Sequence, residues 1–224
     1  YPSHEREARV SGTPTLGSGR IYQHTDEAVA ESQIAIPAHW PRIAGMDFGW
    51  DHKTAVVWLA WDRDSDTIHL YDAYGAPEQT PMVHSLAIKA RGDWIPMAWP
   101  HDGLQHEKGT GDELKKQYLK YGVKMLPKQA THAPDHTTGQ KEGEGGNSVE
   151  LGITELNERI LTGRFKVAKH LNDWFEEYRL YHRKDGKIVK LNDDFMDATR
   201  YAVMMLRHAK VQAQPQRKAM PGHQ

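Results

Sequence analysis

The sequence contains no cysteine, and this absence excludes several kinds of chemistry. Disulfide bonds, thiolate metal sites and cysteine nucleophiles are ruled out, so any metal ion must bind to oxygen or to histidine nitrogen. No run of about 18 apolar residues occurs, which excludes a membrane-spanning helix, and we expect no membrane partner. A Gly-Lys-Ser/Thr phosphate loop is also missing, because Gly109-Thr110-Gly111-Asp112 lacks that ending. We therefore expect no ATPase activity from this chain.

An excess of charge of one sign is missing as well. The 224 residues include 29 Lys and Arg against 30 Asp and Glu, which gives a formal net charge of -1. This balance excludes a polycation that holds nucleic acid by its total charge alone. Hydrophobic residues make up 38% of the chain, enough to build a core, and charged residues make up 26%. The length predicts one substantial domain.

The hydrophobic pattern predicts an α/β fold with a mixed central sheet and helices on its faces. We expect strands at residues 43–49, 54–61, 68–73, 96–99 and 122–126, a short extended piece at 165–167 and a hairpin at 183–189. The first three strands form an antiparallel meander. We expect helices at residues 80–91, 111–121, 148–161, 171–181 and 192–208.

The chain divides by composition into three parts. Residues 1–40 read as a leader, residues 41–208 as the main domain and residues 209–224 as a disordered tail. Residues 133–147 are rich in Gly, Thr, Glu and Lys and show no periodicity, which predicts a mobile loop with little to bury.

Aspartates recur at the ends of the predicted elements. Asp47 and Asp102 each follow an apolar strand, and Asp193, Asp194 and Asp197 open the last helix. Positions 194 and 197 are three residues apart, so both side chains share one helix face. Strand ends and a helix that crosses the same sheet edge bring such carboxylates together.

Carboxylates that converge in this way repel one another, which raises their pKa values unless a cation lies between them. Hard oxygen ligands suit Mg²⁺ or Mn²⁺. Two such ions, about 3.5–4 Å apart, activate water and stabilise a leaving oxygen in phosphoryl transfer. The simpler alternative for each acid is a loop cap, a helix N-cap or a partner of the helix dipole.

Other residues are weaker candidates for the same site. Asp193, Asp51 and His101 are candidates for the second layer around a metal ion. Two lysine groups are candidates for phosphate contacts: Lys184, Lys187 and Lys190 on the predicted hairpin, and Lys115 and Lys116 after Asp102. The alternative for both groups is ordinary solvated charge.

Three motifs together resemble a known family. Met46-Asp47-Phe48-Gly49-Trp50, Pro100-His101-Asp102-Gly103 and the stretch 192–201 resemble the C-terminal nuclease domain of tailed-phage terminase large subunits. The resemblance runs from about residue 43 to residue 206. Residues 17–22 resemble the segment that joins the ATPase domain to the nuclease in that family, so residues 1–40 would be a linker.

The resemblance implies an RNase H-like fold in which Asp47, Asp102 and Asp194 bind metal ions. Related resolvases of this fold use two acids three residues apart in the last helix, which adds Asp197. The implied function is a Mg²⁺- or Mn²⁺-dependent endonuclease with two ions that cuts double-stranded DNA with little sequence preference. The implied partners are DNA, a portal protein and a small terminase subunit, in the host cytoplasm during virion assembly.

Other interpretations stay open at this point. One is a branched-DNA resolvase or transposase-like nuclease of the same fold. Another is a non-catalytic module that docks the portal or a partner subunit. An actin-like nucleotide-binding domain also opens with Asp-x-Gly, but the chain is too short for two such lobes and lacks the Gly-rich phosphate loops.

Overall fold

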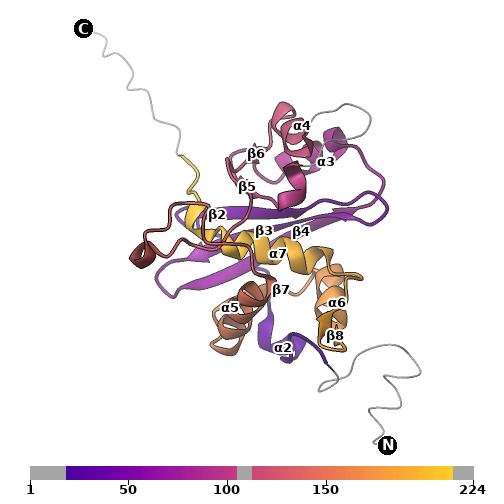
Figure 1. The fold of residues 1–224 in the computed structure, drawn as a ribbon, viewed down its shortest axis with the longest axis vertical. Coiled ribbons are helices and arrows are strands. Elements are labelled where there is room, and N and C mark those ends of the chain that lie inside the picture. The colour runs from indigo at the N-terminus through magenta and orange to yellow at the C-terminus, as the bar shows by residue number, and fades with distance from the viewer. Residues whose placement is uncertain (1–18, 105–112, 214–224) are drawn as a thin grey trace, which may run out of the picture.

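The computed structural model describes residues 19–104 and 113–213. A seven-stranded mixed sheet runs through this part of the chain in the order β1-β7-β4-β3-β2-β5-β6 (Figure 1). Its strands are β1 (Ala30–Glu31), β2 (Arg42–Asp47), β3 (Thr54–Asp62), β4 (Thr67–Ala76), β5 (Pro96–Ala98), β6 (Lys124–Met125) and β7 (Phe165–Ala168). A separate hairpin is formed by β8 (Arg183–Lys184) and β9 (Lys187–Ile188).

The first three long strands form the antiparallel meander that the sequence predicts. β2 pairs with β3 and β3 pairs with β4 in antiparallel register, whereas β5 lies parallel to β2, and β7 lies parallel to β4. Residues 54–60 of β3 are all buried, as expected for a central strand with both faces covered. Parallel pairing of β2 and β5 means that the carboxyl ends of these two strands meet at the same sheet edge.

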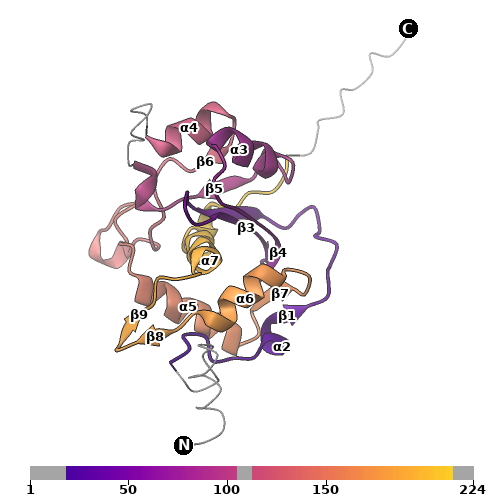
Figure 2. The same cartoon turned by 90° about the vertical axis from the view of Figure 1, so that its right-hand side faces the viewer.

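The helices lie in two layers, one on each side of the sheet (Figure 2). One layer holds α3 (Pro81–Lys89) and α4 (Leu114–Lys120), and the other holds α5 (Val149–Leu161), α6 (Asn172–Leu180) and α7 (Asp194–Met204). The remaining helical turns are α2 (Asp26–Val29) and the 3₁₀ turns η1 (His101–Leu104), η2 (His136–Thr138) and η3 (Leu206–His208). None of the helices in the described residues is long and apolar enough to cross a bilayer.

Two of the predicted helix starts are confirmed by their caps. The Thr80 side chain accepts a hydrogen bond from the Val83 N–H at the start of α3, with Pro81 in the first turn. Ser148 caps α5 in the same way. The predicted hairpin also forms, because Asp185 and Gly186 both adopt positive φ, the geometry that a two-residue turn with matching strand twist requires.

Helix α7 is the most important element for the site because it packs directly on β2 and β3. All of its residues except Tyr201 are buried. It approaches β2 so closely at Gly45 that a Cβ atom there would lie 2.1 Å from the carbonyl oxygen of Ala198 and 2.8 Å from the Cβ of Ala202. Glycine at this position therefore sets the distance between β2 and the helix.

The leader predicted for residues 1–40 stays a prediction, but its described part packs on the domain. Ile21 and Tyr22 are buried, and the Ile21 N–H donates to the carbonyl oxygen of Tyr181. β1, which the sequence analysis did not predict, joins the sheet next to β7. At the other end, Lys210 exchanges backbone hydrogen bonds with Arg42. Residues 214–224 of the predicted tail, like residues 1–18 of the leader, lie outside the described residues.

The segment 133–147 has little regular structure, as predicted, yet side chains anchor it. Glu142 accepts hydrogen bonds from Arg207 at 2.6 Å and lies 3.1 Å from the imidazole of His208. The Arg207 side chain outweighs the effect of burial and lowers the pKa of Glu142 to about 2. The prediction of a mobile loop was based on the lack of apolar residues in this segment. It did not include the charged contacts of Glu142 with the end of the domain.

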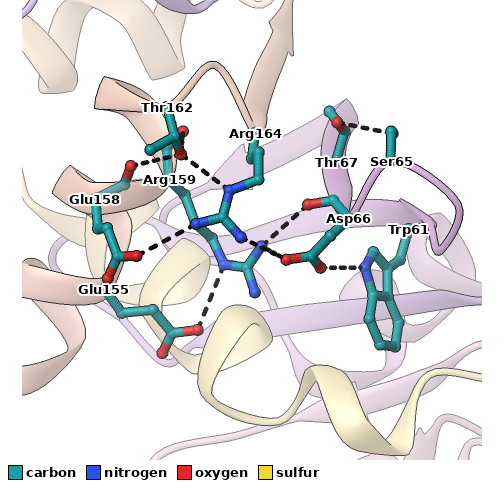
Figure 3. Close-up of polar contacts among 9 residues, drawn as sticks. All are labelled: Trp61, Ser65, Asp66, Thr67, Glu155, Glu158, Arg159, Thr162 and Arg164. Atoms are coloured by element: carbon teal, nitrogen blue, oxygen red, sulfur yellow. Dashed lines mark hydrogen bonds and ion pairs between the residues drawn. The ribbon is translucent and has the colours of Figure 1, made fainter.

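An ion network holds the β3–β4 turn against α5 and β7 (Figure 3). The Asp66 carboxylate accepts from the Trp61 indole N–H at 2.9 Å and from Arg164 at 2.7 Å, and it lies 3.4 Å from Arg159. Burial alone would raise the pKa of Asp66, but the Trp61 hydrogen bond and the charge of Arg159 outweigh it and lower the pKa. The network therefore stabilises the turn when Asp66 is ionised.

Asp66→Asn is expected to reduce the free energy of unfolding at pH 7 by about 0.5–1 kcal/mol, since Asp66 is partly exposed and solvent screens its ion pairs. Asparagine tolerates the positive φ of this position, so the turn is kept. Because the folded pKa is lowered, the stabilisation is present above about pH 4 and is lost as the pH falls through the folded pKa. Urea unfolding should show a smaller difference from the unaltered protein at pH 3 than at pH 7. The exposed neighbour variant Asp64→Asn is the control, and a difference for Asp66→Asn that is as large at pH 3 as at pH 7 would contradict the ionic explanation.

Candidate active site

Four aspartates gather where the carboxyl end of β2 meets the start of α7. Asp47 is the last residue of β2, and Asp193, Asp194 and Asp197 lie at the N-terminus of α7. Burial raises the pKa of Asp47 well above its usual value, and the charges of Asp197, Asp194 and Asp193 raise it further. The predicted convergence of a strand-end acid with acids of the last helix is therefore confirmed for these residues.

The start of α7 explains why the helix tolerates so many acids. Asp193 is the N-cap residue, but its side chain makes no capping hydrogen bond. Asp194 and Asp197 both lie in the first turn and are only 7% exposed. The positive end of the helix dipole favours carboxylates there, although burial opposes it. Because these buried acids lie close together, they require positive charge beside them to stay ionised.

Two protein cations, Lys190 and Arg200, supply this charge, and His52 contacts a third acid. His52 Nδ1 lies 2.7 Å from Asp194 Oδ1, and Arg200 lies 3.0 Å from Asp197 Oδ1. Lys190 Nζ lies 2.8 Å from Asp197 Oδ2 and 3.1 Å from an oxygen of Asp193.

The acids in turn raise the pKa values of Lys190 and Arg200. Burial acts to lower the pKa of Lys190, but the carboxylates of Asp197 and Asp193 outweigh it and hold the pKa above its usual value. Burial likewise acts to lower the pKa of Arg200, and Asp197 outweighs it. Both side chains therefore stay charged beside the acids.

Glu177 of α6 joins the site from a third element, and the sequence analysis missed it. It is 1% exposed, accepts a hydrogen bond from the Phe195 N–H at 2.6 Å and pairs with Lys53 at 2.7 Å. Burial raises the pKa of Glu177 despite the lysine. The signal in the sequence was an acid beside Tyr178 on the apolar face of the helix, where a carboxylate must have a partner.

The loop between β2 and β3 forms the rim of the site. The Thr54 hydroxyl donates to the Gly49 carbonyl at 2.8 Å and accepts from the Gly49 N–H at 3.1 Å, and the Glu78 N–H donates to the Trp50 carbonyl. These bonds fix the backbone, whereas the Trp50 side chain is 57% exposed. Asp51 is exposed in the same loop, and within the described residues no hydrogen bond or ion pair joins it to the four acids.

Asp102 comes from a third element at the same sheet edge. It lies in η1, beyond the end of β5, and its side chain is exposed. Its position on the same sheet edge follows from the parallel pairing of β2 and β5, and a Cβ at the next residue, Gly103, would lie 3.0 Å from the Phe48 ring. His101 Nδ1 lies 2.9 Å from the side-chain oxygen of Gln129, so its ring faces that residue. The positions of these loop residues could not be read from strand order alone.

The predicted basic residues are divided between two elements. Lys184 and Lys187 are exposed on the β8–β9 hairpin, whereas Lys190 is paired with the acids. On α4, Lys115 donates to the Pro127 carbonyl and Lys116 pairs with Glu113. The prediction that these lysines bind DNA stays a prediction.

The donor set suits a hard divalent cation. Its members are carboxylate oxygens, and the buried oxygens Asp193 Oδ2 and Asp197 Oδ1 lack a partner with hydrogen-bond geometry among the described residues. However, no three His, Asp or Glu side chains of residues 19–104 and 113–213 already surround a common point suited to a metal ion. Protein cations balance the acids instead. A divalent ion would therefore fit the chemistry of the site and require rearrangement of its side chains.

The comparison with known families decides the assignment. A family model described as the terminase RNaseH-like domain matches residues 44–206, a segment that contains Asp47, Asp102 and all three acids of α7. The chain belongs to this terminase family. The RNase H-like fold that the sequence predicted is confirmed by this match and by the mixed sheet with its flanking helices.

Individual terminases are similar to the chain over most of its length. The terminase large subunit of Salmonella phage P22 is 48% identical over 225 residues, which cover 99% of this chain and 43% of the relative. The chain thus spans less than half of that relative. The solved nuclease domain of the P22 large terminase is 46% identical, with a TM-score of 0.77 over 88% of this chain and 97% of that domain.

A more distant terminase shares the fold. The nuclease domain of the large terminase from bacteriophage SPP1, solved with bound Mn, has a TM-score of 0.55 and 16% identity over 80% of this chain and 94% of that domain. At this identity the likeness shows the fold of the terminase domain alone.

Proposed function

We propose that this terminase domain is a divalent-metal-dependent endonuclease that cleaves double-stranded DNA during viral genome packaging, by two-metal-ion hydrolysis with little sequence specificity. The observation that carries the proposal is the buried cluster of Asp47 with the three acids of α7, in a chain that matches the terminase family. The similar P22 domain is named a nuclease, and the SPP1 domain binds Mn, which supports a divalent cation here.

Each group at the site has a part in this chemistry. Bound Mg²⁺ or Mn²⁺ would supply activation of a water molecule and stabilisation of the leaving oxygen. Asp47, Asp194 and Asp197 would hold one ion and Asp102, from the same sheet edge, would contribute to a second. Arg200 fixes the carboxylate of Asp197 from the buried side.

The remaining contacts position the acids. His52 orients the Asp194 carboxylate, and the Lys53–Glu177 pair ties the β2–β3 loop to the first turn of α7 through the Phe195 N–H. These contacts hold the loop and the helix at a fixed distance before any substrate arrives.

The biological role follows from the same family. We propose that the domain acts on concatemeric viral DNA in the host cytoplasm during virion assembly, with the portal protein and the small terminase subunit as partners. With a net charge of -1, the domain binds DNA weakly by charge alone, so these partners would hold the substrate.

Plasmid digestion tests the activity. We expect conversion of supercoiled plasmid to nicked and linear forms with Mg²⁺ or Mn²⁺ and none with EDTA, both for this domain and for a longer protein that contains it. Absence of cleavage with every divalent ion in both proteins would contradict the proposal. Faster cleavage of a four-way junction than of a linear duplex would favour a resolvase of the same fold.

Trp50 gives a second test, because it is exposed at the rim while the other six tryptophans are buried or half-buried. We expect a cleavage-deficient protein to protect Trp50 from acrylamide quenching when duplex DNA is added. Trp50→Ala should reduce the quenchable signal and weaken DNA binding by about 1–2 kcal/mol, which is about tenfold in affinity. Trp50→Phe keeps an aromatic ring and should bind nearly as well. Unchanged quenching on saturation with DNA would place this side chain outside the interface.

A further inference from the structure

Lys190 occupies an unusual position between two of the acids at the site. Its ammonium group lies 2.8 Å from Asp197 and 3.1 Å from Asp193, and it comes from the segment that links the β8–β9 hairpin to α7. An ammonium group has three donors, so it can bind both carboxylates at once. It is thus a single positive charge shared by a metal-ligand candidate, Asp197, and a candidate for the second layer, Asp193.

Arg200 and His52 also contact the acids, but they differ from Lys190. Arg200 cannot easily move away from the acids, and His52 contacts a different acid. The Arg200 side chain is 4% exposed, lies 4.6 Å from the Tyr201 ring centroid and packs where a Cβ on Gly152 would meet it at 2.7 Å. It is enclosed on several sides and stays in place. His52 contacts only Asp194 among the acids and carries its charge only when protonated.

Lys190, in contrast, can be exchanged. Its side chain is 57% exposed, so rotation about its flexible stem takes the ammonium group into solvent without disturbing the fold. Its departure would free Asp197 Oδ2 and one oxygen of Asp193 on the open side of the cluster, while Arg200 still holds Asp197 Oδ1 from the buried side.

We propose that Lys190 is the resident counter-ion of the acid cluster, which a divalent cation displaces on entry. This inference rests on the proposed function for its metal.

Metal binding without DNA provides the test. Lys190→Met keeps the length of the side chain and removes its charge, so Mn²⁺ no longer competes with an ammonium group. We expect Mn²⁺ to bind this variant at least fivefold more tightly, by calorimetry or by the electron paramagnetic resonance signal of free Mn²⁺. Lys190→Arg should bind Mn²⁺ no more tightly than the unaltered protein. Lys187→Met, which changes an exposed lysine of the same hairpin that has no ion pair within the described residues, is the matched control.

A measurement on the unaltered protein does not depend on the folding of any variant. In a heteronuclear NMR spectrum of lysine ammonium groups, we expect a slowly exchanging signal in EDTA that is absent from Lys190→Arg. Addition of Mg²⁺ should abolish it. Persistence of the signal at saturating Mg²⁺, or equal Mn²⁺ affinity of the unaltered protein and Lys190→Met, would overturn the inference.

The two proposals fail in different ways. If plasmid is cleaved but Lys190→Met binds Mn²⁺ no more tightly, the exchange is wrong and the nuclease assignment stands. If Mg²⁺ displaces the ammonium signal but no DNA is cleaved under any condition, the nuclease assignment fails and the exchange stands. Failure of the protein to bind either metal would overturn both.

Discussion

Asp47→Asn is expected to abolish plasmid cleavage, with a loss of at least about 1,000-fold in rate, which is about 4 kcal/mol of transition-state stabilisation. Asp47 is the one acid that β2 supplies to the cluster, and the three others all come from α7 and its N-cap. Asparagine has the same shape but lacks the charge that holds a divalent cation. Cleavage is measured as the rate of nicking of supercoiled plasmid in Mg²⁺ and in Mn²⁺.

The same substitution should not unfold the protein. Burial and the neighbouring acids raise the pKa of Asp47, which means that its ionised form destabilises the metal-free fold. Asparagine removes this repulsion, so the midpoint of thermal unfolding in EDTA should stay equal or rise. Asp64→Asn, in the turn at the opposite end of β3, is the control and should cleave normally. Retention of cleavage by Asp47→Asn would refute the proposed active site.

Gly45→Ala is expected to have the largest effect on stability, a loss of about 3 kcal/mol or more in the free energy of unfolding. The added methyl group would lie 2.1 Å from the Ala198 carbonyl oxygen, so β2 and α7 must separate. That separation also moves Asp47 away from Asp194 and Asp197. Cleavage should therefore fall even under conditions in which the variant stays folded.

Urea unfolding provides the measurement, with Gly186→Ala as the comparison. Gly186 has a φ of +76° and open space where a Cβ atom would lie, so alanine there costs about 1–2 kcal/mol of backbone strain and leaves the site intact. Equal urea midpoints for the two variants would show that close packing at Gly45 does not govern the contact between strand and helix.

Much of the fold could be predicted because its long elements have strong periodic signals. The run 54–61 became the buried central strand β3, and the capping residues Thr80 and Ser148 marked two helix starts. The two-residue strand β1 could not be predicted, because only its pairing with β7 distinguishes it from a loop. Short edge strands carry too few residues for a pattern.

The site, like the fold, could be predicted only in part. The convergence of Asp47 with Asp194 and Asp197 could be predicted, since strand order and the three-residue helix spacing bring them together. The partners His52 and Glu177 could not, because their contacts depend on loop conformation and on how α6 packs against α7. Lys190 was predicted to contact phosphate, yet the structure pairs it with acids, a contact set by the path of the chain after the hairpin.

The close fit of α7 on Gly45 also has a consequence for the timing of protein synthesis. Asp47 leaves the ribosome roughly 150 residues before Asp194 does, a delay of about 7–30 s at ordinary translation rates. Over that interval the remaining strands of the sheet are made while the acid cluster is missing three of its four members. A nascent or prematurely ended chain thus lacks three acids of the proposed site, and the proposed activity requires that the last helix has been made and has docked.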